Sequence, residues 1–296
     1  MNKFNGTAVA VITPFLEDKS IDFDALTQLI NLYIEEGVDY LVVLGSTGEA
    51  ATLSYEEKAQ IRAHFIKVVN SRVPLVVGVS SNNTYEVVRE LNSIDLIGFD
   101  AVLSVSPAYN KPSQEGIYQH YKAIAEASPL PVLLYNVPGR TGRNIDVGTV
   151  MRLASDFENI IGIKEAAGDM AQVLELIRLA PKDFLIISGD DLLALPLVLA
   201  GGAGVISVIA HSYPRAFSDM IRLGRERNVE EAFKIHYKLM PAIDLIFEQG
   251  NPTGIKTMLA AQGYCKNELR LPLVVATSDL TQRINEEINS KSINYE

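Results

Sequence analysis

The sequence predicts an α/β fold of the (β/α)8 barrel type, with a helical extension at its C-terminal end. Eight short apolar runs rich in Val, Ile and Leu recur along the chain, and each is followed by a segment with helical spacing. The runs start about 20 to 35 residues apart, which is the length of one strand, loop, helix and return. No region of stacked antiparallel strands interrupts them, so eight such units favour a closed barrel.

The eight expected strands are Thr7–Thr13, Tyr40–Gly45, Pro74–Ser80, Ala101–Ser106, Pro131–Val137, Ile160–Lys164, Phe184–Ser188 and Gly204–Ile209. A doubly wound sheet is the alternative for such a pattern. That fold would require a Gly-x-Gly-x-x-Gly turn after the first strand, and Ile12-Thr13-Pro14-Phe15 does not provide one.

Helix starts carry capping signals at the expected places. Ser54 begins a capping box that Glu57 completes, ahead of apolar residues at helical spacing. Gly37 follows the first expected helix as a C-terminal cap would. The other candidate N-caps, all short polar residues, are Asp22, Thr84, Ser113, Asp146 and Asp169.

The chain divides after the last barrel helix. Beyond the eighth expected strand the only run with strand character is Leu271–Ala276, and the rest has helical patterns. We therefore expect a catalytic barrel over residues 1–224 and a helical extension over residues 225–296.

Composition limits the class of partner. The chain has 296 residues, a formal net charge of -10 and a single cysteine, Cys265. One cysteine excludes an internal disulfide framework and fits a reducing cytoplasm. The negative charge argues against nucleic acid or an anionic membrane as a partner. No apolar stretch approaches the roughly 18 to 20 residues that span a bilayer. Anionic substrates would therefore have to be met by local cations.

In a barrel of this type the chemistry lies at the carboxyl ends of the strands. The side chains expected there include one amine, two phenols and several hydroxyls. They lack the carboxylate and histidine clusters that a divalent metal needs, so we expect no metal. These strand ends are Thr13-Pro14, Ser46-Thr47, Ser80-Ser81, Tyr109, Tyr135, Lys164, Gly189-Asp190 and Ile206-Ser207.

Lys164 and Tyr135 end two successive expected strands. Burial of the lysine would lower its pKa, and a neutral amine attacks carbonyl groups. The pair therefore indicates a Schiff-base lysine with a tyrosine that moves its protons. The alternatives are an ion pair of Lys164 with a carboxylate and a packed core phenol at Tyr135. Glu165 is a poor partner for Lys164, because neighbouring strand residues point to opposite faces.

Three motifs carry a resemblance to a known family. They are Gly45-Ser46-Thr47-Gly48-Glu49, Tyr135-Asn136-Val137-Pro138-Gly139-Arg140-Thr141-Gly142 and Gly162-Ile163-Lys164-Glu165-Ala166-Ala167-Gly168. The chain resembles the pyruvate-dependent class I aldolase superfamily that includes N-acetylneuraminate lyase. Within it, the chain is most similar to the 4-hydroxy-tetrahydrodipicolinate synthase (dihydrodipicolinate synthase) family. These enzymes begin the diaminopimelate route to lysine. The resemblance runs from about Gly6 through Asn251-Pro252.

The resemblance implies an activity and roles for four residues. Lys164 would condense with the keto group of pyruvate, and the resulting enamine would attack the aldehyde of L-aspartate 4-semialdehyde, with no other cofactor. Tyr135, Thr47 and Tyr109 would form a proton relay. In the family this second tyrosine crosses a dimer interface into the neighbouring site, and a homotetramer is the usual state. Without the resemblance, Tyr109 would be an ordinary loop residue.

The resemblance also implies where the carboxylates bind. Ser46 and Thr47 lie in a turn whose amides and hydroxyls suit a carboxylate, although an ordinary strand-to-helix turn could look the same. In the family this turn holds the pyruvate carboxylate, and the backbone of Gly189 and Ile206 frames the pocket. Arg140 can bind a carboxylate bidentately, or it could fix a loop. In the synthases the matching arginine receives the carboxylate of the semialdehyde.

Two other functions stay open at this point. One is a sugar-acid aldolase, such as N-acetylneuraminate lyase or a 2-keto-3-deoxy-sugar-acid aldolase. Serine at the position of Ser46 is common in the sialic acid lyases, whereas the synthases usually have threonine. However, the sugar-acid lyases generally lack the arginine that matches Arg140. The other is a catalytically silent barrel that acts as a binding protein, against which the intact Lys164, Tyr135 and Thr47 argue.

Overall fold

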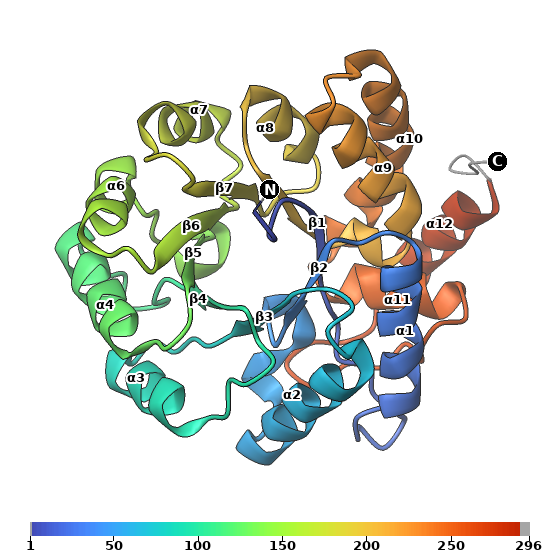
Figure 1. Ribbon diagram of the computed structural model, residues 1–296. Helices are drawn as coiled ribbons and strands as arrows, with labels where there is room; N and C mark the ends of the chain where they lie inside the picture. Colours follow the sequence, from blue (N-terminus) through green and yellow to red (C-terminus); the bar gives the residue numbers. More distant parts are fainter. Residues whose placement is uncertain (1, 291–296) are drawn as a thin grey trace.

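Eight parallel strands close into a barrel in the order β1 to β8 in the computed structural model, which describes residues 2–290 (Figure 1). The strands are β1 (Gly6–Ala10), β2 (Tyr40–Val43), β3 (Leu75–Gly78), β4 (Ala101–Val105), β5 (Val132–Asn136), β6 (Ile160–Glu165), β7 (Leu185–Ser188) and β8 (Gly204–Ser207). Each overlaps one of the eight expected runs, so the predicted fold class is confirmed.

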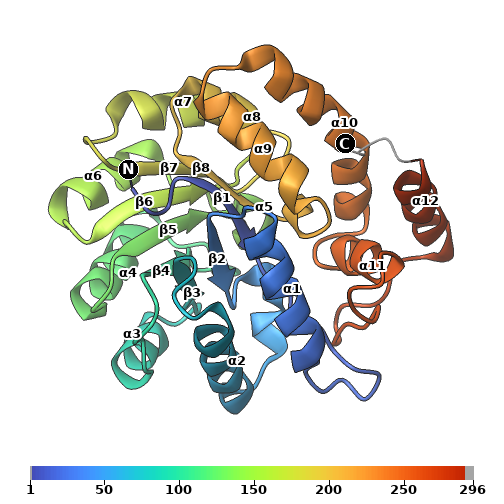
Figure 2. The same cartoon turned by 45° about the vertical axis from the view of Figure 1, so that its right-hand side comes forward.

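Helices surround the strands in a ring (Figure 1). The α-helices of the ring are α1 (Phe23–Glu35), α2 (Tyr55–Val69), α3 (Thr84–Ser93), α4 (Gln114–Ala127), α6 (Val147–Asp156), α7 (Met170–Leu179), α8 (Ala194–Ala200) and α9 (Pro214–Arg225). The one-turn helix α5 (Pro138–Thr141) lies inside the ring, just after the carboxyl end of β5 (Figure 2). Short 3-10 turns η1 (Ser46–Gly48), η2 (Ala50–Thr52) and η3 (Ile209–His211) follow the carboxyl ends of β2 and β8.

The capping predictions are confirmed at most helix starts. Ser54 and Glu57 form the reciprocal capping box of α2. Asp22, Ser113 and Asp169 accept backbone N–H groups at the starts of α1, α4 and α7, and Asp146 takes the N-cap position of α6 without such a bond. The prediction for Thr84 is wrong by one residue. Asn83 is the cap, because its side-chain oxygen accepts from the N–H of Tyr85.

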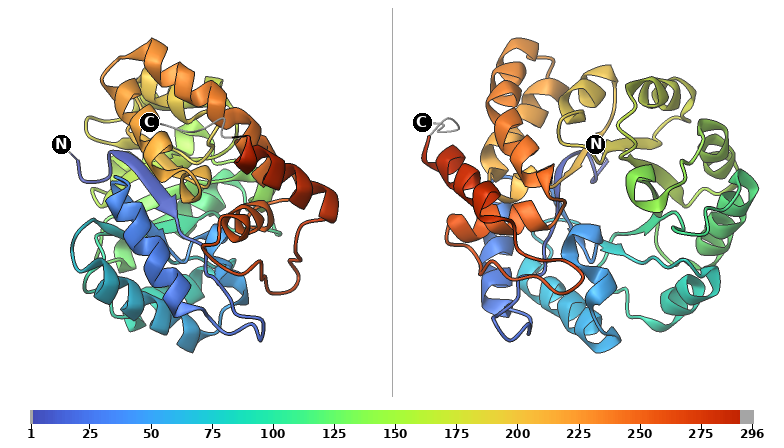
Figure 3. Two further views of the ribbon diagram at one scale, coloured as in Figure 1. Left: turned by 90° about the vertical axis from the view of Figure 1, so that its right-hand side faces the viewer. Right: turned by 180° about the vertical axis from the view of Figure 1, so that it is seen from behind.

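Three further helices extend the barrel on one side, next to α1 and α9 (Figures 2 and 3). They are α10 (Val229–Glu248), α11 (Thr253–Ala261) and α12 (Ser278–Asn289). The predicted extension ran to residue 296, and residues 291–296 lie outside the described residues. Within residues 2–290, no helix combines the length and apolar character needed to span a bilayer.

The run Leu271–Ala276 is not a strand, so that expectation is wrong. A strand needs a neighbour to pair with, and a closed barrel leaves no free edge. The segment instead runs irregularly between α11 and α12, with the side chain of Leu271 79% exposed. β-Propensity alone therefore misled the assignment at this point.

Alternate residues of each strand divide the core into two clusters. On β5, Leu133 and Tyr135 pack inside the barrel, whereas Val132 and Leu134 pack against the surrounding helices. Both clusters are largely inaccessible to solvent. Because the interior is filled by side chains, the space for chemistry is confined to the end of the barrel where the strands finish.

The barrel closes where β8 meets β1, and the backbones approach closely there. Gly204 pairs with Gly6, and a Cβ atom added at Gly204 would lie 1.9 Å from the Gly6 carbonyl oxygen. No side chain fits without moving one of the two strands. Glycine is therefore required at this position for the barrel to close.

We predict that Gly204→Ala destabilises the fold by at least about 1 to 3 kcal/mol, since overpacking against backbone cannot be relieved by a rotamer change. Thermal unfolding followed by circular dichroism would measure the effect. Gly148→Ala on α6 is the matched control, because a Cβ there meets nothing within 4 Å. That variant should unfold at or slightly above the wild-type temperature. Equal melting temperatures for both variants would contradict the prediction.

Candidate active site

Lys164 and Tyr135 lie side by side at the ends of β6 and β5. The two residues are direct partners in the strand register, and the Lys164 Nζ lies 4.5 Å from the centre of the Tyr135 ring. Both are buried, with 5% and 8% of their surfaces exposed. Burial lowers the pKa of Lys164 to about 7, with Asp191 opposing the shift and Arg140 adding to it. A substantial fraction of the amine is therefore uncharged and nucleophilic near neutral pH.

Glu165 points away from Lys164, as the strand alternation predicts. Its carboxylate accepts hydrogen bonds from Asn136 and Gln172 side chains and from the Ala167 N–H, at 2.7 to 3.0 Å. Burial raises the pKa of Glu165, and these donors oppose the rise. Glu165 therefore braces the neighbouring strand and loop and leaves Lys164 to face the cavity.

Asp191 is a charged neighbour of Lys164 that sequence reasoning did not identify. It follows β7, is 2% exposed, and accepts from the N–H groups of Val208 and Ile209 at 3.1 and 2.9 Å. Burial raises the pKa of Asp191 to about 6, against the effect of these donors. Its position just past a strand end was a usable signal, but the fold was needed to bring it near Lys164.

The Ser46–Gly48 turn lies beyond β2 and is fixed from two directions. The Thr13 hydroxyl donates to the Gly48 carbonyl at 2.7 Å, and the Asn251 amide donates to the Thr47 hydroxyl at 2.8 Å. Thr47 is 4% exposed. Burial raises the pKa of Tyr135, with Arg140 and a hydrogen bond from Ser46 opposing the rise. The turn and the phenol therefore belong to one site.

Arg140 projects from the short helix α5 and donates to the Asn251 carbonyl at 2.8 Å. Asn251, which lies just before α11, was named only as the end of the resemblance and not as a site residue. Its contacts with Thr47 and Arg140 show that the helical extension forms part of the site. Sequence spacing offered no signal for contacts across so many residues.

Two adjoining cavities of about 490 and 560 Å³ occupy this end of the barrel. Tyr135, Arg140 and Asn251 line both of them. Ser46 lines the first, and Lys164 lines the second. Together they hold an amine, a phenol, hydroxyls and a guanidinium. Such a set can bind a carboxylate and form an imine with a carbonyl group.

Gly189 allows Lys164 to reach the cavity. A Cβ at Gly189 would lie 2.8 Å from Cε of Lys164, so a larger residue would displace the amine. Ile206 on β8 is fully buried in the cluster inside the barrel and lines neither of these two cavities. Tyr109 also lies outside both cavities, with 92% of its surface exposed and a left-handed backbone at φ 67°.

The described residues contain no group of three or more His, Cys, Asp or Glu side chains placed to hold a metal ion. His211 is buried, and its two ring nitrogens bond the Ile12 N–H and the Val208 carbonyl. Cys265 is partly buried, and burial raises the pKa of its thiol to about 11. Neither residue lines either cavity.

Comparisons with known proteins agree with this geometry. The model of the dihydrodipicolinate synthetase family matches residues 3–291. The chain is 57% identical over 285 residues to 4-hydroxy-tetrahydrodipicolinate synthase of Flavobacterium psychrophilum, covering 96% of this chain and 97% of the relative. It is 44% identical to that of Bacillus subtilis, over 93% and 95% of the two chains.

A solved structure gives the same result in three dimensions. The dihydrodipicolinate synthase of Thermotoga maritima superposes with a TM-score of 0.96 at 35% identity, over 99% of this chain and 100% of that one. The similarity therefore includes the C-terminal helices as well as the barrel. With the family model matching almost from end to end, the chain belongs to the dihydrodipicolinate synthetase family, as its three motifs predicted.

Proposed function

We propose that the chain condenses pyruvate with L-aspartate 4-semialdehyde to give 4-hydroxy-tetrahydrodipicolinate, through a Schiff base on Lys164. The observation that carries the proposal is the buried Lys164 amine beside Tyr135, with a pKa lowered to about 7. The relatives that share the sequence over nearly its full length are named as synthases of this product. Their name favours this reading over a sugar-acid aldolase or a silent barrel.

The covalent step follows from the state of Lys164. Its neutral amine attacks the keto carbon of pyruvate, and loss of water from the carbinolamine gives an imine. Loss of a methyl proton then gives an enamine, whose carbon attacks the aldehyde. The amino group of the semialdehyde then attacks the imine carbon and displaces the Lys164 amine, which closes the ring of the product and frees the enzyme. Tyr135 moves protons to and from the carbinolamine and the new alkoxide. No other cofactor is needed for this chemistry.

The phenol of Tyr135 needs partners to exchange protons. An unperturbed phenol has a pKa of about 10, and burial raises that of Tyr135 further. We assign Thr47 and Tyr109 as the rest of the relay. Because Tyr109 is 92% exposed and lies outside both cavities of its own chain, we assign it to the site of a second copy. A homotetramer built as a dimer of dimers would supply this contact.

The two carboxylates have separate sites in this proposal. The Ser46–Gly48 turn receives the carboxylate of pyruvate, close to Tyr135. Arg140, which lines both cavities, receives that of the semialdehyde. We assign the frame of the imine pocket to Gly189, which lines the cavity that contains Lys164, and not to Ile206, which lines neither cavity. The net charge of -10 makes such local groups necessary for anionic substrates, and the single cysteine favours a cytoplasmic location.

The direct test compares substrates. We expect turnover with pyruvate plus aspartate semialdehyde, and no cleavage of N-acetylneuraminate. Borohydride reduction in the presence of pyruvate should add the mass of the reduced adduct to wild type and to Lys122→Ala, which changes only an exposed helical lysine. Lys164→Ala should give no adduct. Wild-type turnover by Lys164→Ala would exclude the mechanism.

We predict that the rate of adduct formation rises with pH through about 7 and is level above about pH 8, because the neutral amine of Lys164 is then already dominant. The rate rises with pH because the Lys164 amine loses its proton, and its lowered pKa completes this loss at a pH well below the pKa of an ordinary lysine. Trapping at a series of pH values would measure it. A rate that keeps rising toward pH 10 would mean that burial does not lower this pKa.

Tyr135→Phe and Thr47→Val should slow adduct formation by about 100- to 10,000-fold without abolishing it, since each removes a proton-transfer group but leaves the nucleophile. Single-turnover trapping would measure both rates. Tyr118→Phe is the matched control, because its hydroxyl bonds Asp156 between two surface helices. Tyr118→Phe should keep the wild-type rate of adduct formation. If this variant were slowed as much as Tyr135→Phe, the slowing would be no evidence for a proton relay.

Arg140→Ala should raise the KM for aspartate semialdehyde and leave pyruvate adduct formation intact. The loss of a bidentate charged hydrogen bond typically costs about 1.5 to 3 kcal/mol, or about 10- to 100-fold. Arg140→Lys keeps the positive charge but loses the bidentate geometry of the guanidinium, so its KM should lie between those of wild type and Arg140→Ala. Separate Michaelis constants for the two substrates would show the split. An equal loss for both substrates would mean that the two carboxylate sites are wrongly assigned.

A further inference from the structure

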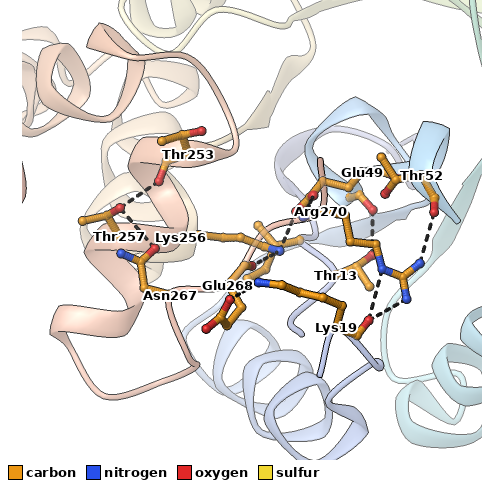
Figure 4. Close-up of polar contacts among 12 residues, drawn as sticks. Thr13, Lys19, Glu49, Thr52, Thr253, Lys256, Thr257, Asn267, Glu268 and Arg270 are labelled. Atoms are coloured by element: carbon orange, nitrogen blue, oxygen red, sulfur yellow. Dashed lines mark hydrogen bonds and ion pairs between the residues drawn. The ribbon is translucent and has the colours of Figure 1, made fainter. Parts of the chain in front are cut away.

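A buried ion pair joins the active-site turn to the helical extension. Glu49, the residue after the Ser46–Gly48 turn, lies 2.5 Å from the Nζ of Lys256 on α11, and neither side chain has exposed surface (Figure 4). The two residues are 207 positions apart. Neither belongs to the proposed chemistry, so the pair needs another explanation.

Both partners make further contacts within the same cluster. Lys256 also donates to the Glu268 carbonyl at 2.9 Å and lies 4.2 Å from the centre of the Phe15 ring. The second oxygen of Glu49 accepts from the Arg270 N–H at 3.1 Å. Figure 4 shows these groups converging from α11, from the loop after it and from the region of η1 and η2. The extension therefore holds Glu49 at two points.

Stability alone is a weak reason for such a pair. Burial lowers the pKa of Lys256, which means that the site disfavours the charge, while Glu49 opposes the shift. Well-packed apolar residues in place of a buried ion pair are often as stable or more so. A charged pair does, however, define one relative position of its two partners more narrowly than apolar packing does.

The backbone carries the position of Glu49 into the turn. Glu49 has a left-handed conformation at φ 51°, and its N–H donates to the Ser46 carbonyl at 3.2 Å. Gly48 in turn donates to the Gly45 carbonyl and accepts from Thr13. A shift of Glu49 would therefore move the hydroxyls and amides of the turn.

A second contact from the same part of the extension reaches the turn directly. Asn251, two residues before α11, donates to the Thr47 hydroxyl at 2.8 Å. Asn251 thus contacts Thr47 in the middle of the turn, and Lys256 on α11 contacts Glu49, the residue that follows the turn. With contacts at two neighbouring positions, the turn can neither shift nor rotate relative to α11 without breaking one of them.

We propose that Glu49 and Lys256 are positioning residues, whose buried ion pair ties the Ser46–Gly48 turn to α11 and sets the geometry with which the turn receives the carboxylate of a 2-keto acid. The proposal rests on the function assigned above to that turn. It makes the helical extension a working part of the site, although the nucleophile comes from the barrel.

Three variants separate positioning from simple stabilisation. Lys256→Met leaves the Glu49 carboxylate buried and unpaired, so it should lower the melting temperature. The double variant Glu49→Gln, Lys256→Met has no buried charge and should recover most of the wild-type melting temperature. Lys266→Met is the matched control, because it removes an exposed Lys–Glu pair, with Glu17, that also joins the extension to the barrel but does not reach the turn.

The readout is the dependence of borohydride-trapped adduct on pyruvate concentration, together with the maximal trapping rate. We expect the double variant to need roughly 10- to 100-fold more pyruvate for half-maximal trapping, because a misplacement of about 1 Å can cost about 100-fold. The maximal rate should fall less than in Thr47→Val, since Lys164, Tyr135 and the Thr47 hydroxyl itself are all retained. Lys266→Met should match wild type in both quantities.

A double variant that folds and needs no more pyruvate than wild type would overturn the proposal. An equal increase for Lys266→Met would do the same, because any loss of a link to the extension would then suffice. Failure of the proposed function looks different. In that case wild type itself forms no pyruvate adduct on Lys164, whatever the state of the ion pair.

Discussion

The burial of the Lys164 amine at the end of β6 is the constraint on which the rest of the site depends. An amine lowers its pKa to about 7 only where water is excluded and few opposite charges compensate. The barrel meets this condition because its interior is packed with apolar side chains up to the layer that holds Tyr135. Gly189 then provides the space through which the lysine side chain reaches the cavity. A looser barrel or a bulkier neighbour would give an ordinary, protonated lysine.

The second requirement is a rigid set of polar groups around that amine, and the barrel does not supply it alone. Strand ends place Lys164 and Tyr135, but the Ser46–Gly48 turn and Arg140 are each held by Asn251 from the extension. Helix α10 adds Ile243 and Phe247 to the lining of the cavity that contains Lys164. The extension therefore closes the site and orders the groups on its rim.

The sequence was sufficient for features that depend on local period and on strand order. Tyr135 and Lys164 stand at the ends of two successive expected strands, Pro131–Val137 and Ile160–Lys164, and the register of β5 and β6 confirms that they are neighbours. The capping box at Ser54 likewise marked the start of α2. Features that depend on distant contacts were not accessible. The link between Glu49 and Lys256 spans 207 residues, and no spacing rule connects them. The strand prediction for Leu271–Ala276 was wrong for the opposite reason. The segment has local strand propensity, but a closed barrel leaves no strand edge for it to pair with.

The charge of the site changes during the proposed reaction, and the surroundings of Lys164 suit that change. Before reaction about half of the Lys164 amine is neutral at pH 7, so the permanent positive charge at the cavity is that of Arg140, which suits anion binding. Once an imine forms and is protonated, a positive charge lies at the former Nζ. Asp191, with a pKa of about 6, is mostly ionised at pH 7 and lies in the same cavity lining. The carboxylate thus opposes the lowering of the Lys164 pKa only in part, yet it can stabilise the cation that follows.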